Sequence, residues 1–295
     1  MIIDNQTISS NPPNSLPIAP DQKSAFNFGI GLLGLFLWNL FFLNGPAMKK
    51  VWGALLNTVL ISGLTVVLTL LLALAAAFSL HLLEVTGRQK GRFILLFALN
   101  LIRSVPQIIG VLLGYALLSF LITNGVVGNG IMAFVIMACS LSLFIFLEVT
   151  DLLLDRIAHF RKSDFYNALR VCGLSESRVV GFNILWNNSR IHILNKLLSV
   201  FGMALFLQCS TDFILSVGLS RDAEVTSLPL SLGGLLAHID SKQDILAMGY
   251  TLTHPLYLPH LFLQHLQGLS AAFLIVFTLY SLYKIGNGFS ERHRL

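Results

Sequence analysis

The stretch that decides the fold is residues 52–80, which read WGALLNTVLISGLTVVLTLLLALAAAFSL. It contains no charged residue and is longer than the roughly 20 apolar residues that cross a bilayer as a helix. We therefore expect a membrane-spanning helix that tilts or continues beyond the hydrocarbon region. Its small residues favour close packing against neighbouring helices.

Further charge-poor stretches on both sides of this helix indicate a polytopic membrane protein. Of the 295 residues, 55% are hydrophobic and only 11% are charged, whereas an ordinary soluble domain has about 25% charged residues. This composition excludes a water-soluble enzyme. Turns, prolines and charges divide the apolar material into six expected spans, at about 27–45, 53–83, 93–122, 127–150, 191–219 and 266–286.

The basic residues indicate how the chain is oriented. Most of the 19 lysine and arginine residues fall on one side of the six expected spans, and the positive-inside rule then places both termini in the cytoplasm. The net charge of +5 is spread in short clusters beside hydrophobic segments, so no nucleic-acid partner is expected. In the third span, Pro106 removes a backbone donor and predicts a kink or a local break.

The predicted organisation has three parts. Residues 1–26 are expected to form a disordered cytoplasmic tail, residues 27–50 the first transmembrane helix and an external turn, and residues 51–290 the core. The core contains a cytoplasmic loop at 151–190 and an external loop at 220–265, both much longer than a turn.

The cytoplasmic loop contains the strongest local pattern. From Asp164 to Cys172 apolar residues recur at helical spacing, and Gly173 is expected to end this helix. Ser175 can then cap a second helix that leads to the next span. The pattern predicts a helix, a glycine turn and a helix beneath the membrane, which could transmit a push from a docked partner. An amphipathic helix lying on the lipid surface fits the same spacing.

This loop resembles the hallmark loop of the membrane subunits of ATP-binding-cassette importers. The run DFYNALRVCGLSESRVVGFNIL, residues 164–185, is similar without gaps to the DFVEAARALGAS…R…ILP stretch of dipeptide, oligopeptide and nickel permeases. Asn167 stands where that family has Glu, and it cannot make the same ionic contact. Three more segments resemble parts of these permeases: RSVPQIIGVLLGYALL at 103–118, QCSTDFILSVGLS at 208–220 and LYSLYKIGNGFSERHRL at 279–295.

The resemblance implies an all-α type I importer permease fold with about six transmembrane helices and a cytoplasmic coupling helix. It implies import of peptides or a similar small solute across the bacterial inner membrane by alternating access. The partners would be a cytoplasmic ATPase dimer, a second and related permease subunit, and a periplasmic solute-binding protein. The coupling role then falls on the matching positions Asp164, Phe165, Asn167, Ala168, Leu169, Arg170, Gly173, Ser175 and Arg178.

The residues themselves indicate a separate energy source. No Gly-Lys dipeptide occurs, so the chain has no GxxxxGK[ST] loop to hold nucleotide phosphates. ATP and Mg²⁺ are therefore expected only in the partner ATPase, with no cofactor on this chain. The motifs GxSxG and HExxH are also absent, which argues against a serine protease or a zinc protease. No metal site is expected either, because the external histidines His238, His254, His260 and His265 match no compact ligand spacing.

Polar residues within the spans need a separate explanation. Asp212 lies past the middle of the fifth expected span and near Gln208. These two residues are candidates for the transport pathway, although a structural hydrogen bond to a neighbouring helix would also account for them. For Arg103, Glu148 and Asp151, near span ends, we expect snorkelling or local pairing.

Two other functions fit the sequence. A secondary transporter would use Asp212 or Glu148 for proton coupling and would need no ATPase. A non-transporting subunit would keep the permease fold with a degenerate coupling loop.

Overall fold

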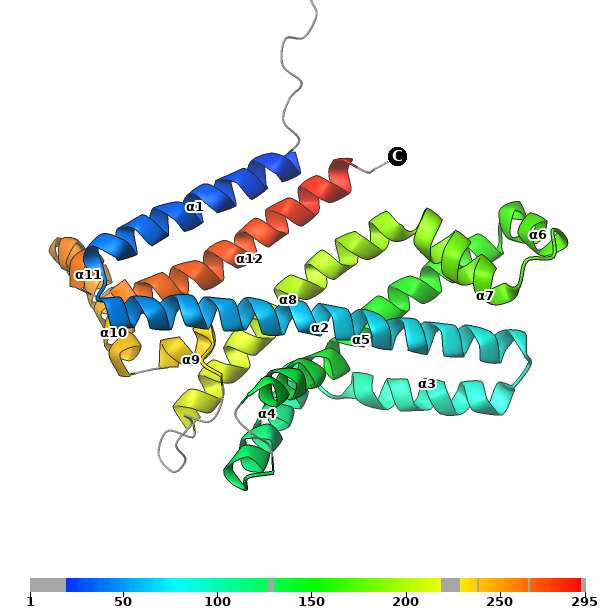
Figure 1. Cartoon of the computed structure of the whole chain (residues 1–295), viewed down its shortest axis with the longest axis horizontal. Helices are drawn as coiled ribbons and strands as arrows, with labels where there is room; N and C mark the ends of the chain where they lie inside the picture. The colour runs from blue at the N-terminus through cyan, green and yellow to red at the C-terminus, as the bar shows by residue number, and fades with distance from the viewer. Residues whose placement is uncertain (1–19, 127–129, 219–228, 238, 265, 293–295) are drawn as a thin grey trace, which may run out of the picture.

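The computed structural model describes residues 20–126, 130–218, 229–237, 239–264 and 266–292, and these parts contain helices and no strands (Figure 1). The helices in chain order are α1 (Pro20–Phe42), α2 (Gly45–Val85), α3 (Gln89–Ser104), α4 (Gln107–Thr123), α5 (Ile131–Arg161), α6 (Asp164–Val171), α7 (Glu176–Arg178), a π-helix (Val179–Asn188), α8 (Arg190–Gly218), α9 (Leu232–Ala237), α10 (Ile239–Thr253), a 3-10 turn (Pro255–Tyr257), α11 (Leu258–Gln264) and α12 (Leu266–Arg292).

Among the described helices, α1, α2, α5, α8 and α12 are long and apolar enough to cross a membrane. The pair α3 and α4 meets the same criterion only when taken together. The chain is therefore a multi-pass helical membrane protein, as its composition predicts. Helices α1 and α12 run side by side (Figure 1), and the rings of Phe28 and Phe277 stack 5.5 Å apart between them.

The break predicted at Pro106 is confirmed, but it is much sharper than a kink. Helix α3 ends at Ser104, Val105 is extended, and α4 begins at Gln107 with its axis turned by 88°. Proline has no N–H to continue the helical hydrogen bonds and disfavours helical geometry in the residue before it. The predicted span at 93–122 is thus a sharply bent pair of helices, which only together are long and apolar enough to cross a membrane. Helix α3 runs back along α2, and α4 leaves in another direction (Figure 1).

Helix α2 has 41 residues, so it is about 60 Å long and extends well beyond a hydrocarbon core of about 30 Å. Its buried face consists mainly of small and hydroxyl side chains, including Thr58, Ser62, Thr65 and Thr69. Such residues let neighbouring backbones approach closely. Helix α2 accordingly packs against both α5 and α8.

Two helices extend beyond the limits predicted for the spans. Helix α5 continues to Arg161 rather than ending at residue 150, because the exposed Asp151 and Asp155 face outward without breaking the helix. The first part of the predicted loop at 151–190 is thus helical. At the other end, α1 begins at Pro20, before the predicted end of the tail, and residues 1–19 lie outside the described residues.

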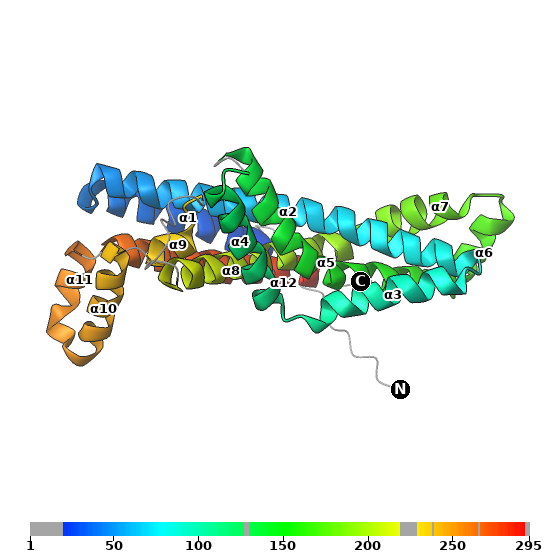
Figure 2. The same ribbon diagram turned by 90° about the horizontal axis from the view of Figure 1, so that it is seen from below.

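The predicted external loop at 220–265 is largely helical where it is described, since it contains α9, α10 and α11. Figures 1 and 2 show α10 and α11 at one end of the molecule and α6, α7 and the α2–α3 turn at the opposite end. The two polar regions of the sequence therefore occupy opposite ends of the molecule.

The charged residues near span ends form local pairs, as expected. The Arg103 guanidinium donates to both carboxylate oxygens of Asp151, at 2.7 and 2.8 Å. Lys196 donates to Glu148 at 2.7 Å, and the Gln107 amide donates to the other oxygen of Glu148 at 3.3 Å. These contacts tie α3, α4 and α8 to α5.

Candidate functional site

The candidate site is the unit formed by α6, the Gly173 turn and α7, at the end of the molecule opposite α10 and α11 (Figures 1 and 2). It begins at Asp164, whose carboxylate lies favourably at the positive end of the α6 dipole. The predicted order of helix, glycine turn and helix is confirmed, although α7 is short and continues directly into the π-helix.

The turn at Gly173 is a Schellman motif. The N–H of Gly173 donates to the Arg170 carbonyl at 3.0 Å, and the N–H of Leu174 donates to the Leu169 carbonyl at 3.3 Å. Gly173 has φ +79°, a left-handed conformation that costs other residues about 1–2 kcal/mol. The turn thus requires glycine because of its backbone conformation, and a Cβ at this position would meet open space.

Helix α6 has two apolar faces with different surroundings. The inner face, Tyr166 and Leu169, packs against the main hydrophobic core together with Leu174. The outer face consists of Phe165, Ala168, Val171 and Cys172, all of which are exposed. Val171 is 89% exposed, so the outer face of α6 presents apolar surface.

The predicted coupling residues lie on the inner face of α6, on its outer face, or at exposed positions around the outer face. Leu169 faces inward, whereas Phe165 and Ala168 lie on the outer face. The remaining predicted side chains are exposed around them, namely Asp164, Asn167, Arg170, Ser175 and Arg178. Ser175 occupies the expected N-cap position of α7, but its side chain makes no capping hydrogen bond.

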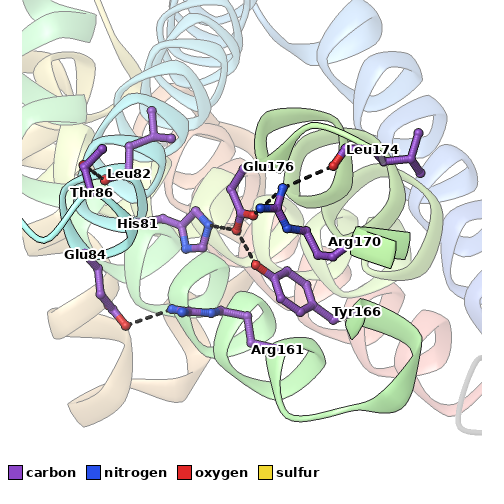
Figure 3. A network of polar contacts seen from close by, with 9 residues as sticks. All are labelled: His81, Leu82, Glu84, Thr86, Arg161, Tyr166, Arg170, Leu174 and Glu176. Atoms are coloured by element: carbon purple, nitrogen blue, oxygen red, sulfur yellow. Dashed lines mark hydrogen bonds and ion pairs between the residues drawn. The ribbon is translucent and has the colours of Figure 1, made fainter. Parts of the chain in front are cut away.

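Glu176 holds the unit to the rest of the molecule (Figure 3). One carboxylate oxygen, Oε1, lies 2.8 Å from Nε2 of His81 on α2 and accepts a 2.5 Å hydrogen bond from the Tyr166 hydroxyl on α6. The other oxygen forms a 3.3 Å ion pair with Arg170. The Glu176 side chain is only 12% exposed and that of His81 only 2%. This network joins α6, α7 and the end of α2.

The surroundings of Glu176 favour its charged form. Burial raises the pKa of this carboxyl, but hydrogen bonds from Tyr166 and His81 and electrostatic interactions with His81 and Arg170 together lower the pKa below its ordinary value. Burial raises the pKa of Tyr166, and its hydrogen bond to Glu176 raises it further. The tyrosine therefore stays a donor and Glu176 an acceptor at neutral pH.

A second ion pair supports the same region. Arg161, at the end of α5, donates to Glu84 on α2 at 2.8 Å (Figure 3), and Arg92 on α3 lies 3.5 Å from the other oxygen of Glu84. These side chains are one third exposed or more, so each pair contributes at most about 1 kcal/mol. Their role is to align the ends of α2, α3 and α5.

Sequence reasoning missed the residues that anchor the unit. Glu176, His81 and Tyr166 are not among the predicted coupling residues. His81 is separated from Glu176 by 95 residues. A signal was available, because His81 is a titratable residue at the end of a long apolar helix, where burial requires a partner.

The predicted pathway residues lie apart from this unit, on α8. Gln208 is fully buried and accepts a 3.2 Å hydrogen bond from Ser62 on α2. Asp212 is 5% exposed and is hydrogen-bonded by Ser231, just before α9. The structural alternative, a hydrogen bond to another element, is thus present for both residues.

The external histidines show no metal-binding arrangement in the described part of the chain. The His254 ring stacks on Tyr250 with centroids 4.1 Å apart, and that of His260 stacks on Tyr257 at 5.4 Å. His238 and His265 lie outside the described residues. Among the described residues, no group of three or more His, Cys, Asp or Glu side chains is placed to hold a metal ion.

Acidification is expected to loosen the unit formed by α6, the Gly173 turn and α7 below a pH of about 4.3, the ordinary value for glutamate. Because the pKa of Glu176 is lower in the folded protein than in the unfolded chain, its carboxylate stabilises the fold above this pH, and the stabilisation is lost as the pH falls through the lowered pKa. Hydrogen–deuterium exchange of residues 164–178, corrected for intrinsic rates, should therefore increase in acid.

The variant Glu176→Gln should show faster exchange already at neutral pH. Losing hydrogen bonds to a charged group costs about 2 kcal/mol, which corresponds to roughly 30-fold faster exchange. Glu291→Gln is the matched control, because Glu291 is exposed near the end of α12. Unchanged protection of 164–178 in Glu176→Gln would show that the network does not hold the unit.

The chain was also compared with known proteins. No protein-family model matches it, and no curated protein matches it.

Proposed function

We propose that the chain is the permease subunit of an ATP-driven solute importer, in which the α6–Gly173–α7 unit couples a cytoplasmic ATPase dimer to the spans. The observation that carries this proposal is the outer face of α6, an exposed apolar surface on a unit whose inner face is anchored in the core. A partner that covered this face would remove the apolar surface from water.

The connections of the unit explain how a push on it would reach the membrane. It follows α5 directly and leads through the π-helix into α8, and the Glu176–His81 contact links it to α2. Movement of α6 would therefore act on three spans at once. Rigid elements with specific contacts carry such coupling, whereas a flexible loop would absorb it.

The partners and the solute follow from the same proposal. The ATPase dimer would bind ATP and Mg²⁺, a second and related permease subunit would complete the pathway, and a periplasmic binding protein would dock at the end that contains α10 and α11. The membrane would be the bacterial inner membrane, with both termini cytoplasmic. Peptides or similar small solutes are the proposed cargo, based on the resemblance of residues 164–185 to peptide and nickel permeases.

Affinity purification of the tagged chain in mild detergent, followed by mass spectrometry and an ATPase assay, tests the proposal. We expect recovery of an ATPase that has a phosphate-binding loop, together with a second permease. A binding protein recovered in the same complex would identify the solute class. Recovery of the chain alone, under conditions that keep a control importer intact, would overturn the proposal.

A secondary transporter is the second candidate, and the buried Asp212 is the observation that favours it. Uptake would then persist without ATP and collapse when the proton gradient is dissipated.

A subunit that had lost transport would instead purify with its partners but show no solute-stimulated ATPase activity.

A further inference from the structure

A cluster of buried polar side chains lies where α8 packs against α2, α4 and α9, the last of which belongs to the segment 229–237. From α8 it contains Gln208, Thr211 and Asp212, and from α4 it contains Tyr115. Three of these four side chains are fully buried, and Asp212 is 5% exposed. The Tyr115 phenol lies close enough to Asp212 for the two groups to interact electrostatically.

The segment 229–237 closes this cluster on the side of α10 and α11. Asn57 on α2 donates to the Leu230 carbonyl at 2.8 Å, and the Leu232 N–H donates to the Thr58 hydroxyl at 3.0 Å. Ser231, between these two residues, is hydrogen-bonded to Asp212. The segment is thus fastened to α2 on one side and to α8 on the other.

Four polar atoms of the cluster have no hydrogen-bond partner among the described residues. They are the Tyr115 hydroxyl, Nε2 of Gln208, Oγ1 of Thr211 and Oδ2 of Asp212. Each such buried group costs about 1–3 kcal/mol if it stays unsatisfied. The Gln208 nitrogen donates, the Asp212 oxygen accepts when ionised, and the two hydroxyls can do either. A water molecule can both donate and accept hydrogen bonds, so water satisfies this combination.

The carboxylate is the most costly member of the cluster. Within the described part of the chain, Asp212 forms no ion pair with a lysine, arginine or histidine. A buried charge without a partner costs several kcal/mol, and the neutral acid avoids this cost. Tyr115 on α4 and Cys209 on α8 are titratable groups near Asp212, and neither supplies a positive charge. The α2 side chains that bond to Gln208 and to segment 229–237 are the hydroxyls of Ser62 and Thr58 and the amide of Asn57. None of them carries a charge.

We propose that Asp212 is a protonation site inside the subunit, at which the carboxyl group holds a proton and bridging water completes the hydrogen bonds of Tyr115, Gln208 and Thr211. The proton comes from bulk water and converts the carboxylate into the neutral acid, so no other reactant is needed. Because segment 229–237 covers the cluster, the proton exchanges when this segment or α8 moves.

Infrared difference spectroscopy of the purified protein complex tests this proposal directly. A protonated carboxyl has a C=O stretching band that a carboxylate lacks. We expect this band at neutral pH in the wild type, shifted when aspartate is labelled with ¹³C in its carboxyl group. We expect it to be lost in Asp212→Asn and kept in Asp155→Asn, the control on an exposed aspartate of α5.

Asparagine has the shape of the neutral acid, so Asp212→Asn should fold. If it does not, Asp212→Glu provides the same test, because its band should no longer shift with the aspartate label. Absence of the band in the wild type at neutral pH, its persistence in Asp212→Asn, or its appearance only when sodium is removed would each overturn the proposal. The last result would identify a sodium site. The assay observes the carboxyl itself, so its failure is distinguishable from failure of the ATP-driven function.

Discussion

Replacing Ala168 by arginine is expected to abolish ATP-coupled transport while the subunit still inserts and folds. Ala168 lies on the exposed outer face of α6, so the new side chain disturbs no packed residue of this subunit. In the complex it would place an unpaired charge in the proposed docking surface, at a cost of about 2–5 kcal/mol. The ATPase should then bind at least about 30-fold more weakly, as measured by co-purification and solute-stimulated ATPase activity.

Gly173→Pro should abolish transport by a different route. Proline has φ near −65°, whereas Gly173 has φ +79° and donates an N–H to Arg170. The turn would therefore be lost, and α6 would no longer present its outer face. Gly173→Ala, which keeps the N–H, should cause a partial loss.

Thr86→Arg is the control for the charge, because Thr86 is exposed at the same end of the molecule but outside α6. It should leave both ATPase binding and transport unchanged. If Ala168→Arg and Gly173→Pro transported solute as well as the wild type, the coupling role of this unit would be refuted.

The second large effect is expected at Gly233, where segment 229–237 packs against α8. A Cβ added to Gly233 would lie 2.6 Å from the carbonyl carbon and the Cα of Cys209, and closer still to the carbonyl oxygen. These are backbone atoms of a long helix and cannot rotate away as a side chain would. Gly233→Ala should therefore destabilise the protein by about 3 kcal/mol and lower Tm by about 5 °C or more.

Gly234→Ala is the matched control one residue away. Its Cβ would meet Ser216 and Ser231 at 3.6 Å and Leu230 at 3.9 Å, which are ordinary contacts. Both variants remove a glycine from α9, so the backbone entropy changes similarly. Equal Tm values for the two variants, measured in the same detergent, would contradict the close packing of α9 on α8.

The turn at Gly173 and the break at Pro106 were both predictable because each depends on local backbone chemistry. Proline lacks an N–H wherever it occurs, and a glycine after a helical pattern takes the left-handed conformation that ends the helix. The magnitude of the break was not predictable. The angle of 88° between α3 and α4 depends on how α3 packs on α2 and α5 and how α4 packs on α5 and α8.

The end of α5 shows what the pattern of charges does not determine. Asp151 ended the predicted span, yet the helix continues to Arg161. A charge marks where a helix leaves the hydrocarbon, but it does not end the hydrogen bonding of the helix. Asp151 instead pairs with Arg103 on α3.

The sequence by itself determined that this chain is helical and embedded in a membrane. Long apolar segments must satisfy their backbone hydrogen bonds internally in lipid, and a helix does so within each segment. Only the tertiary structure decided that His81 meets Glu176, that Ser62 meets Gln208, and that the outer face of α6 stays uncovered. Such contacts depend on the rotation and register of each helix. The sequence of a helix that is apolar on all sides does not specify them, because lipid and protein are similarly favourable surroundings for apolar side chains.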